Sequence, residues 1–217
     1  WSAGVPGAND QAIFDSPMVV NPFLGASHSI GQLNFSAADA AGYTLAAAAG
    51  QVLTLSSATA ISSGNSAGTN TIAADLILAG GKTKSIVQSG RGTLALHGSI
   101  GEDTPGTAVT FARVSNAFPV FVLTGQNTFS GNATIADGTL LASSLGSMGV
   151  AGALGTGEKI VLGNVTTSSS RGVTLIYTGP GETSDKVLHI GAGSGDRVIS
   201  TAGATGGLVL TADIVIS

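Results

Sequence analysis

The histidines of this 217-residue chain are the side chains best suited to metal or acid–base chemistry, and they are widely scattered. His28, His97 and His189 are separated by 69 and 92 residues. A metal site needs several His or carboxylate ligands that converge on one point, and the sequence places no two histidines close together. We therefore expect all three to occupy surface or turn positions, and we predict no metal site.

The acidic residues give an equally thin basis for catalysis. Glycoside hydrolysis needs two carboxylates that face each other at a defined separation. Glu102 and Asp103 are adjacent and lie close to Pro105, which indicates a solvated loop. The other acidic residues considered form no repeating register: Asp75, Asp137, Glu158, Glu182, Asp185, Asp196 and Asp213. We predict no catalytic residue, no cofactor and no enzymatic activity; a polysaccharide-active β-helix enzyme is the third alternative.

A glycine-rich stretch, Gly191-Ala-Gly-Ser-Gly-Asp196, resembles two catalytic motifs in composition only. A nucleophile elbow lies between a strand and a helix, and a phosphate loop continues with Gly-Lys-Ser/Thr into a helix. Neither continuation is present after Asp196. We interpret the stretch as a turn between short strands.

The composition excludes several classes of protein. Charged residues make up 9% of the chain, against about 25% in typical domains, yet the mean hydropathy of +0.41 is too high for a disordered polar chain. The net charge is −4 and the eight Lys and Arg residues are scattered singly, whereas nucleic-acid binding uses clustered positive charge. Cysteine is absent, which excludes a disulfide framework.

The elements that remain to position any site are short strands. Pairs of apolar residues two positions apart recur along the chain, as in Leu33/Phe35, Leu53/Leu55, Leu76/Leu78, Leu94/Leu96, Val109/Phe111, Phe121/Leu123, Leu175/Tyr177, Leu188/Ile190, Leu208/Leu210 and Ile214/Ile216. A period of two indicates strands with one face inward. Intervals of 20 residues, as from Leu33 to Leu53 and from Leu188 to Leu208, indicate the coils of a solenoid. A sandwich of antiparallel hairpins remains open, but small residues and few aromatics favour the solenoid.

Three segments depart from this pattern. Residues 1–25 contain three of the six prolines and the only tryptophan, and we expect an N-terminal capping segment there. Residues 26–217 are expected to form the solenoid repeats, with a looped insertion at about residues 99–119. The residues 143–157 have little side-chain volume, which is typical of a glycine-rich loop or a short helix.

The most specific motif is Val122-Leu-Thr-Gly-Gln-Asn-Thr-Phe-Ser-Gly-Asn-Ala-Thr-Ile-Ala-Asp-Gly-Thr-Leu-Leu141. It resembles the autotransporter-associated β-strand repeat. The positions that match are Asn127, Thr128, Phe129, Gly131, Thr134, Ile135, Gly138 and Leu140. The resemblance implies an elongated, right-handed parallel β-helix on the surface of a Gram-negative-type bacterium. We expect Phe129, Ile135 and Leu140 to point inward, and Asn127 and Asn132 to occupy corners.

These observations predict an extracellular structural protein, a β-solenoid segment of a bacterial surface adhesin or fibre that acts as a stalk or cell-surface contact. The alternative is a subunit of a self-assembling extracellular filament. The apolar strand Ile214–Ile216 at one end predicts end-to-end self-association or continuation in a longer chain. Candidate ligands are a host surface or a glycan. The chain begins at Trp1 without a leader, which we interpret as removal of a targeting signal, and no run of about 18 apolar residues predicts a membrane span.

Overall fold

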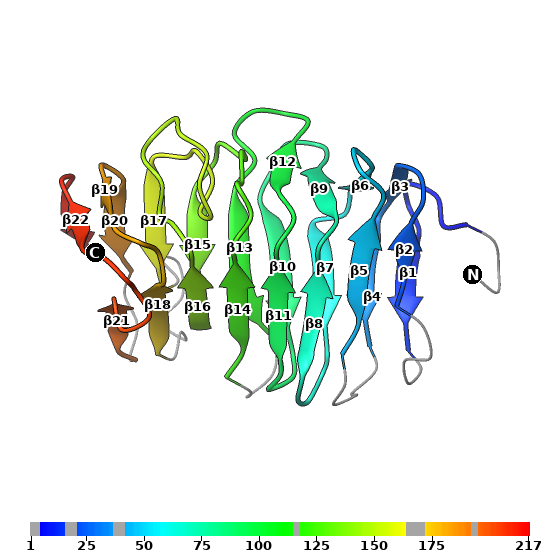
Figure 1. Ribbon diagram of the computed structural model, residues 1–217, viewed down its shortest axis with the longest axis horizontal. Helices are drawn as coiled ribbons and strands as arrows, with labels where there is room; N and C mark the ends of the chain where they lie inside the picture. Colours follow the sequence, from blue (N-terminus) through cyan, green and yellow to red (C-terminus); the bar gives the residue numbers. More distant parts are fainter. Residues whose placement is uncertain (1–4, 16–20, 37–41, 115–117, 164–171, 192–194) are drawn as a thin grey trace.

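The computed structural model describes residues 5–15, 21–36, 42–114, 118–163, 172–191 and 195–217. Short strands follow one another around three faces and then begin again one layer further along the long axis (Figure 1). Every pairing between named strands is parallel. The protein is therefore an all-β parallel β-solenoid, which confirms the predicted fold class and excludes the sandwich. Its right-handed sense stays a prediction.

The first face is a nine-stranded sheet that runs the whole length of the stack, with β1 and β23 as its two outermost strands (Figure 1). Its strands, in spatial order, are β1 (Gln11–Phe14), β4 (Gln32–Phe35), β7 (Thr59–Ser63), β10 (Lys84–Gln88), β13 (Val109–Arg113), β15 (Ala133–Ile135), β17 (Lys159–Leu162), β20 (Val187–Ile190) and β23 (Ile214–Ile216).

The second face is an eight-stranded sheet that follows the first face turn by turn. Its strands are β2 (Phe23–Leu24), β5 (Thr44–Ala47), β8 (Thr69–Ile72), β11 (Thr93–Leu96), β14 (Val120–Leu123), β16 (Gly138–Ala142), β18 (Val173–Tyr177) and β21 (Arg197–Ser200).

The third face is divided into two sheets. One contains β3 (His28–Ile30), β6 (Val52–Leu55), β9 (Asp75–Leu78) and β12 (Ile100–Glu102), and the other contains β19 (Glu182–Ser184) and β22 (Leu208–Leu210). Between β12 and β19 the described residues contribute no strand to this face.

One turn of the solenoid is longer than the sequence spacing predicted. Ile61 pairs with Ile86, and Ile86 pairs with Phe111, so each of these turns takes 25 residues. The predicted interval of about 20 residues is wrong because it joins two faces of one turn: Leu33 lies on the first face and Leu53 on the third. The partner of Leu33 in the next turn is Ile61.

The interior is built from the inward positions of all three faces. On the first face the side chains of Leu33, Ile61, Ile86, Phe111 and Ile135 stack in register and are almost fully buried. The alternating apolar pairs predicted this pattern along most of the chain. The pair Ile214/Ile216 differs, because at the C-terminal end its side chains are 57% and 79% exposed.

The inward positions of the motif agree with the resemblance. Phe129, Ile135 and Leu140 are fully buried, which confirms their inward direction. Asn127 and Asn132 both lie in the connection 124–132 between β14 and β15. Asn127 is buried, whereas Asn132 is exposed.

Two predicted segments contain regular strands. Residues 1–25 include β1 and β2, which pair in parallel with β4 and β5 and so form part of the first turn. Residues 99–119 include β12 and β13, with the connection 103–108 between them. Residues 143–157 form a glycine-rich loop with no helix. The described part of the chain contains no helix long and apolar enough to cross a bilayer.

Candidate functional site: an anchored excursion on the third face

Residues 143–157, called the excursion below, leave the end of β16 and return at β17. The excursion lies where the third sheet is interrupted, and it is held there by the turns on both sides. Asn127 and Gly152 form an antiparallel bridge, in which the Asn127 N–H donates to the Gly152 carbonyl at 3.0 Å and the Gly152 N–H donates back at 3.3 Å. This pairing docks the excursion on the preceding turn.

The Asn127 side chain connects three consecutive turns. It is fully buried. Its Oδ1 accepts a hydrogen bond from the Ile100 N–H of β12 at 2.8 Å, and its Nδ2 donates to the Ala153 carbonyl of the excursion at 2.6 Å. A buried backbone group without a partner costs free energy, so one amide stabilises both the end of the regular third sheet and the excursion that follows.

Phe129 lies against the far end of the excursion. The Thr156 N–H donates to the Phe129 carbonyl at 2.9 Å. Gly155 has a φ of +71°, and a Cβ added there would come within 2.6 Å of the Phe129 ring. Glycine is therefore required at residue 155 both for the backbone conformation and for the close approach to the ring.

Two carboxylates of the following turn bind the first half of the excursion. Glu182 accepts hydrogen bonds from the N–H groups of Leu145 and Gly146, and Asp185 accepts one from the Met148 N–H at 2.7 Å. Hydrogen bonds from backbone N–H groups to a carboxylate are charge-assisted and stronger than neutral ones. The carboxylates therefore fix the backbone of the excursion.

Lys186 binds the second half. Its side chain is only 2% exposed, and its Nζ donates to the carbonyls of Gly155 at 2.6 Å and Leu154 at 3.2 Å. Burial lowers the pKa of Lys186 from 10.5 to about 8, an effect that the nearby carboxylates of Glu182 and Asp185 oppose. Desolvation of the ammonium group outweighs the attraction of the two carboxylates.

A second buried lysine repeats this arrangement earlier in the chain. The Nζ of Lys84 donates to the carbonyls of Ser56 at 2.6 Å and Ser57 at 3.2 Å, in the preceding turn. Burial lowers the pKa of Lys84, with Asp103 opposing that shift and Lys82 adding to it. Both lysines therefore donate hydrogen bonds to backbone carbonyls near the connection that leads from the third face to the first.

These anchors were missed by the sequence analysis. Their signal is modest: Lys84 and Lys186 each stand at the start of an alternating apolar run, in a chain with only eight basic residues. Glu182 and Asp185 were considered as possible catalytic carboxylates. The structure brings these two together on the excursion, where they accept hydrogen bonds from backbone groups.

The exposed surface of the excursion is apolar at its tip. Met148 is 51% exposed and Val150 is 57% exposed, and the carboxylate of Asp185 lies beside them through its bond to Met148. This arrangement presents two apolar side chains on a rigidly held loop.

The structure disperses the other candidate residues. His97 is exposed and bonds to the Thr124 hydroxyl at 2.7 Å, His189 is half-buried and bonds to the Ser217 hydroxyl at 2.8 Å, and His28 is exposed. No group of three or more His, Asp or Glu side chains that could hold a metal occurs among the described residues. Residues 192–194 of the predicted glycine-rich turn lie outside them.

The adjacent acidic residues Glu102 and Asp103 accept hydrogen bonds at the loop that the sequence predicted. Glu102 accepts hydrogen bonds from the Thr107 N–H at 2.8 Å and the Ser130 hydroxyl at 2.5 Å. Asp103 accepts from the Gly80 N–H at 2.9 Å and the Thr104 hydroxyl at 2.9 Å, and these bonds lower the pKa of Asp103. Both carboxylates organise the connection between β12 and β13.

Comparison with known proteins gives one informative match. The chain is 28% identical over 210 residues to the adhesin BmaC autotransporter of Brucella suis biovar 1 (strain 1330). The alignment covers 94% of this chain but only 6% of that adhesin. No protein-family model matches the chain, and no solved structure matches it at a significant level. The chain is therefore a β-solenoid that is distantly homologous to a short part of an autotransporter adhesin.

Proposed function

We propose that this chain is a β-solenoid segment of a bacterial surface adhesin or fibre, secreted to the cell surface and acting there as a stalk or contact surface. The observation that carries the proposal is the combination of a parallel stack with homology that spans nearly the whole chain and a small part of a much longer adhesin. Each turn pairs its backbone groups with its neighbours, so the stability of such a stack is approximately a sum of interfaces between turns. A stack of this kind is suited to a non-enzymatic, mechanical role.

Continuation in a longer chain is supported by the comparison, because the chain matches only 6% of a much longer adhesin. A parallel solenoid can extend by further turns, since each turn pairs only with its neighbours.

The alternative, a self-assembling filament, is favoured by one observation. The side chains of Ile214, Val215 and Ile216 are 57%, 41% and 79% exposed on β23, which pairs with β20 and lies at the edge of the first sheet. Such an edge pairs readily with another chain. Electron microscopy of the concentrated 217-residue chain tests this alternative: filaments would support it, and a stable monomer would contradict it.

Antibodies raised against the 217-residue chain test the main proposal. We expect them to label intact cells of the producing bacterium and to detect a polypeptide far larger than the 21.1 kDa of this chain. External protease should remove the labelling. A protein of this size found only inside the cells would contradict both the surface location and the longer parent chain.

The contact role is tested on the excursion. The double variant Met148→Ser and Val150→Ser removes the apolar tip, and Val114→Ser is a matched control because Val114 is 71% exposed elsewhere on the molecule. If the excursion is the contact surface, the double variant should bind less well to host cells or to a glycan array than the parent and control chains. Equal binding by all three chains would restrict the proposal to a stalk.

A further inference from the structure

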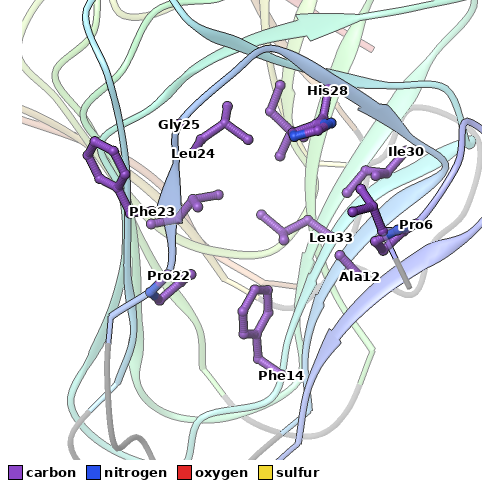
Figure 2. A pocket seen from close by; sticks show the side chains of 13 residues that line it. Pro6, Ala12, Phe14, Pro22, Phe23, Leu24, Gly25, His28, Ile30 and Leu33 are labelled. Carbon is purple, nitrogen blue, oxygen red and sulfur yellow. The ribbon is translucent and has the colours of Figure 1, made fainter. Parts of the chain in front are cut away.

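The last residue of the first-face strands changes in character from β1 to β13. In β1 and β4 it is Phe14 and Phe35, whose ring centroids lie 5.3 Å apart, and Phe14 also lines an apolar pocket at the N-terminal end of the solenoid (Figure 2). The residues that follow in register are Ser63, Gln88 and Arg113. These three residues, called the polar column below, therefore continue an aromatic stack with hydrogen-bonding side chains.

The first two members of the polar column are bound at the corner between the first and second faces. The Ser63 hydroxyl donates to Oδ1 of Asn65 at 2.9 Å. Gln88 is fully buried, and its Nε2 donates to the same oxygen at 2.7 Å and to the Gly92 carbonyl at 3.0 Å. These two acceptors fix the orientation of the Gln88 amide, because the reverse orientation would place Oε1 beside two oxygens that cannot donate. The Oε1 atom therefore needs a partner of its own.

Two buried atoms of the polar column have no hydrogen-bond partner within the part of the chain that the structure describes. They are Oε1 of Gln88 and Nη1 of Arg113. The Arg113 side chain is 11% exposed, and its Nε lies 3.4 Å from Oδ1 of Asp137. Buried polar groups in folded proteins almost always have a protein or water partner. Here one atom is an acceptor and the other a donor, and their residues are paired in register on neighbouring strands.

We propose that one internal water molecule bridges Gln88 and Arg113, accepting a hydrogen bond from Nη1 and donating one to Oε1. Neighbouring strands lie about 4.8 Å apart, whereas a direct N–H···O bond needs about 2.9 Å between its heavy atoms. Two hydrogen bonds of about 2.8 Å through one water reach up to about 5.6 Å, which fits residues paired on neighbouring strands. A buried water needs at least two polar partners, and this pair supplies them.

The chemistry of the two atoms selects water over an ion. A cation would be attracted by the Gln88 amide oxygen but repelled by the Arg113 guanidinium group. An anion would be attracted by the guanidinium group but repelled by the amide oxygen. A water molecule both accepts and donates, so it satisfies the two atoms together. The bridge joins the hydrogen bonds around Asn65 to the Arg113–Asp137 ion pair across successive turns, and it does not depend on the adhesin role.

A high-resolution crystal structure of the 217-residue chain tests the proposal directly. We expect electron density for one water oxygen within hydrogen-bond distance of both Oε1 of Gln88 and Nη1 of Arg113. Direct contact between these two atoms, an ion or a protein group in this position, or two separated atoms with no density between them would each overturn the proposal.

Magnetic relaxation dispersion of the solvent, which counts long-lived internal waters, tests the proposal in solution. Arg113→Met removes the donor and keeps a long side chain, so the count should fall by one. Arg91→Met is the matched control, because Arg91 is exposed in the connection between β10 and β11; its count should equal that of the parent. Circular dichroism checks that both variants fold, and the crystal structure of the parent decides if Arg113→Met does not. Equal counts in three folded chains would overturn the proposal.

Discussion

The third face of the solenoid is covered in two different ways along its length. From β3 to β12 it is a regular sheet in which Leu53, Leu76 and Ile100 stack in register. Between β12 and β19 the interior is covered by the connection 124–132, which contains the buried Phe129, and then by the excursion. In the regular part the hydrogen bonds between neighbouring strands satisfy the backbone N–H and C=O groups. Any strand sequence with apolar residues at the inward positions is therefore compatible with this part of the face. In the excursion, side chains of neighbouring turns must reach individual backbone groups.

This difference decides where single substitutions matter. Leu53 or Leu76 contributes mainly buried apolar area, which another side chain of similar volume can replace. Asn127, Glu182 and Lys186 each contribute hydrogen bonds to specific backbone atoms of neighbouring turns. A substitution that leaves such a buried group without its partner lowers the unfolding free energy by the full desolvation penalty of that group. We therefore expect the excursion to depend on residue identity, and the regular sheet on volume.

The largest expected effect is that of Phe129→Ala, which removes the ring beneath the excursion. Phe129 is fully buried, and a Phe-to-Ala change in a core costs about 3–5 kcal/mol of unfolding free energy. In the regular part Leu78→Ala should cost about 2–5 kcal/mol. Chemical denaturation measures both. Phe118→Ala is the surface control, and a Phe129→Ala chain that unfolds together with this control would contradict the register.

The buried lysine predicts a pH dependence of opposite sign to that of a lysine in a salt bridge. The pKa of Lys186 is about 8 when folded and has its ordinary value of 10.5 when unfolded. Between these values the unfolded chain binds more protons, so the unfolding free energy rises with pH. The gain is about 3 kcal/mol between pH 8 and 10.5, at 1.36 kcal/mol per pKa unit, and is absent below pH 8.

Lys186→Met tests this effect, because the variant lacks the buried ammonium group and keeps a side chain of similar length. The difference in unfolding free energy between the two chains should change in favour of the parent as the pH rises through 8. The corresponding variant Lys84→Met should show a change of the same sign, since burial also lowers the pKa of Lys84. Identical pH profiles for parent and Lys186→Met would show that the ammonium group is well solvated.

Asn127→Ala compares the two parts of the third face directly. It leaves the Ile100 N–H of the regular sheet and the Ala153 carbonyl of the excursion without their partner. Each unsatisfied buried group costs about 1–3 kcal/mol. Asn132→Ala is the control from the same motif, since Asn132 is exposed and surface substitutions usually stay within about 0.5 kcal/mol. Equal losses in the two variants would refute the linking role of Asn127.

The same contrast explains what the sequence could predict. Alternating pairs such as Phe121/Leu123 report burial directly, because a strand repeats every two residues; this predicted the strands and most of the interior. The length of a turn was mispredicted because apolar pairs from different faces alternate along the sequence. The sequence of a pair does not show to which face it belongs. The motif around Phe129 lies where the third sheet is interrupted, but the motif itself did not predict that interruption.

The anchors could not be predicted because their partners are backbone atoms. Lys186 binds the carbonyls of Leu154 and Gly155, about thirty residues earlier, and any sequence has carbonyls at every position. No pairing of side-chain types marks such a contact. The sequence analysis found no catalytic register for Glu182 and Asp185 and assigned them no other role, whereas their hydrogen bonds to the excursion hold its backbone. Only the three-dimensional register shows which turn they reach.

The smallest expected effect is that of removing the histidines. His97 follows β11, in a turn that belongs to the regular part of the third face, and His189 lies in β20, after the excursion. Replacing both therefore tests the two regions that are compared. Each bonds to one hydroxyl, of Thr124 or Ser217, and His28 is exposed. Replacing all three with Gln should change the unfolding free energy by about 0.5 kcal/mol or less per site, and a chelator should not alter the melting temperature of the parent. A chelator-induced loss of stability would reveal a metal that bridges turns. The stability of part of the molecule would then depend on metal-ligating side chains. The comparison between a sheet held by backbone hydrogen bonds and an excursion held by side chains would have to include that metal.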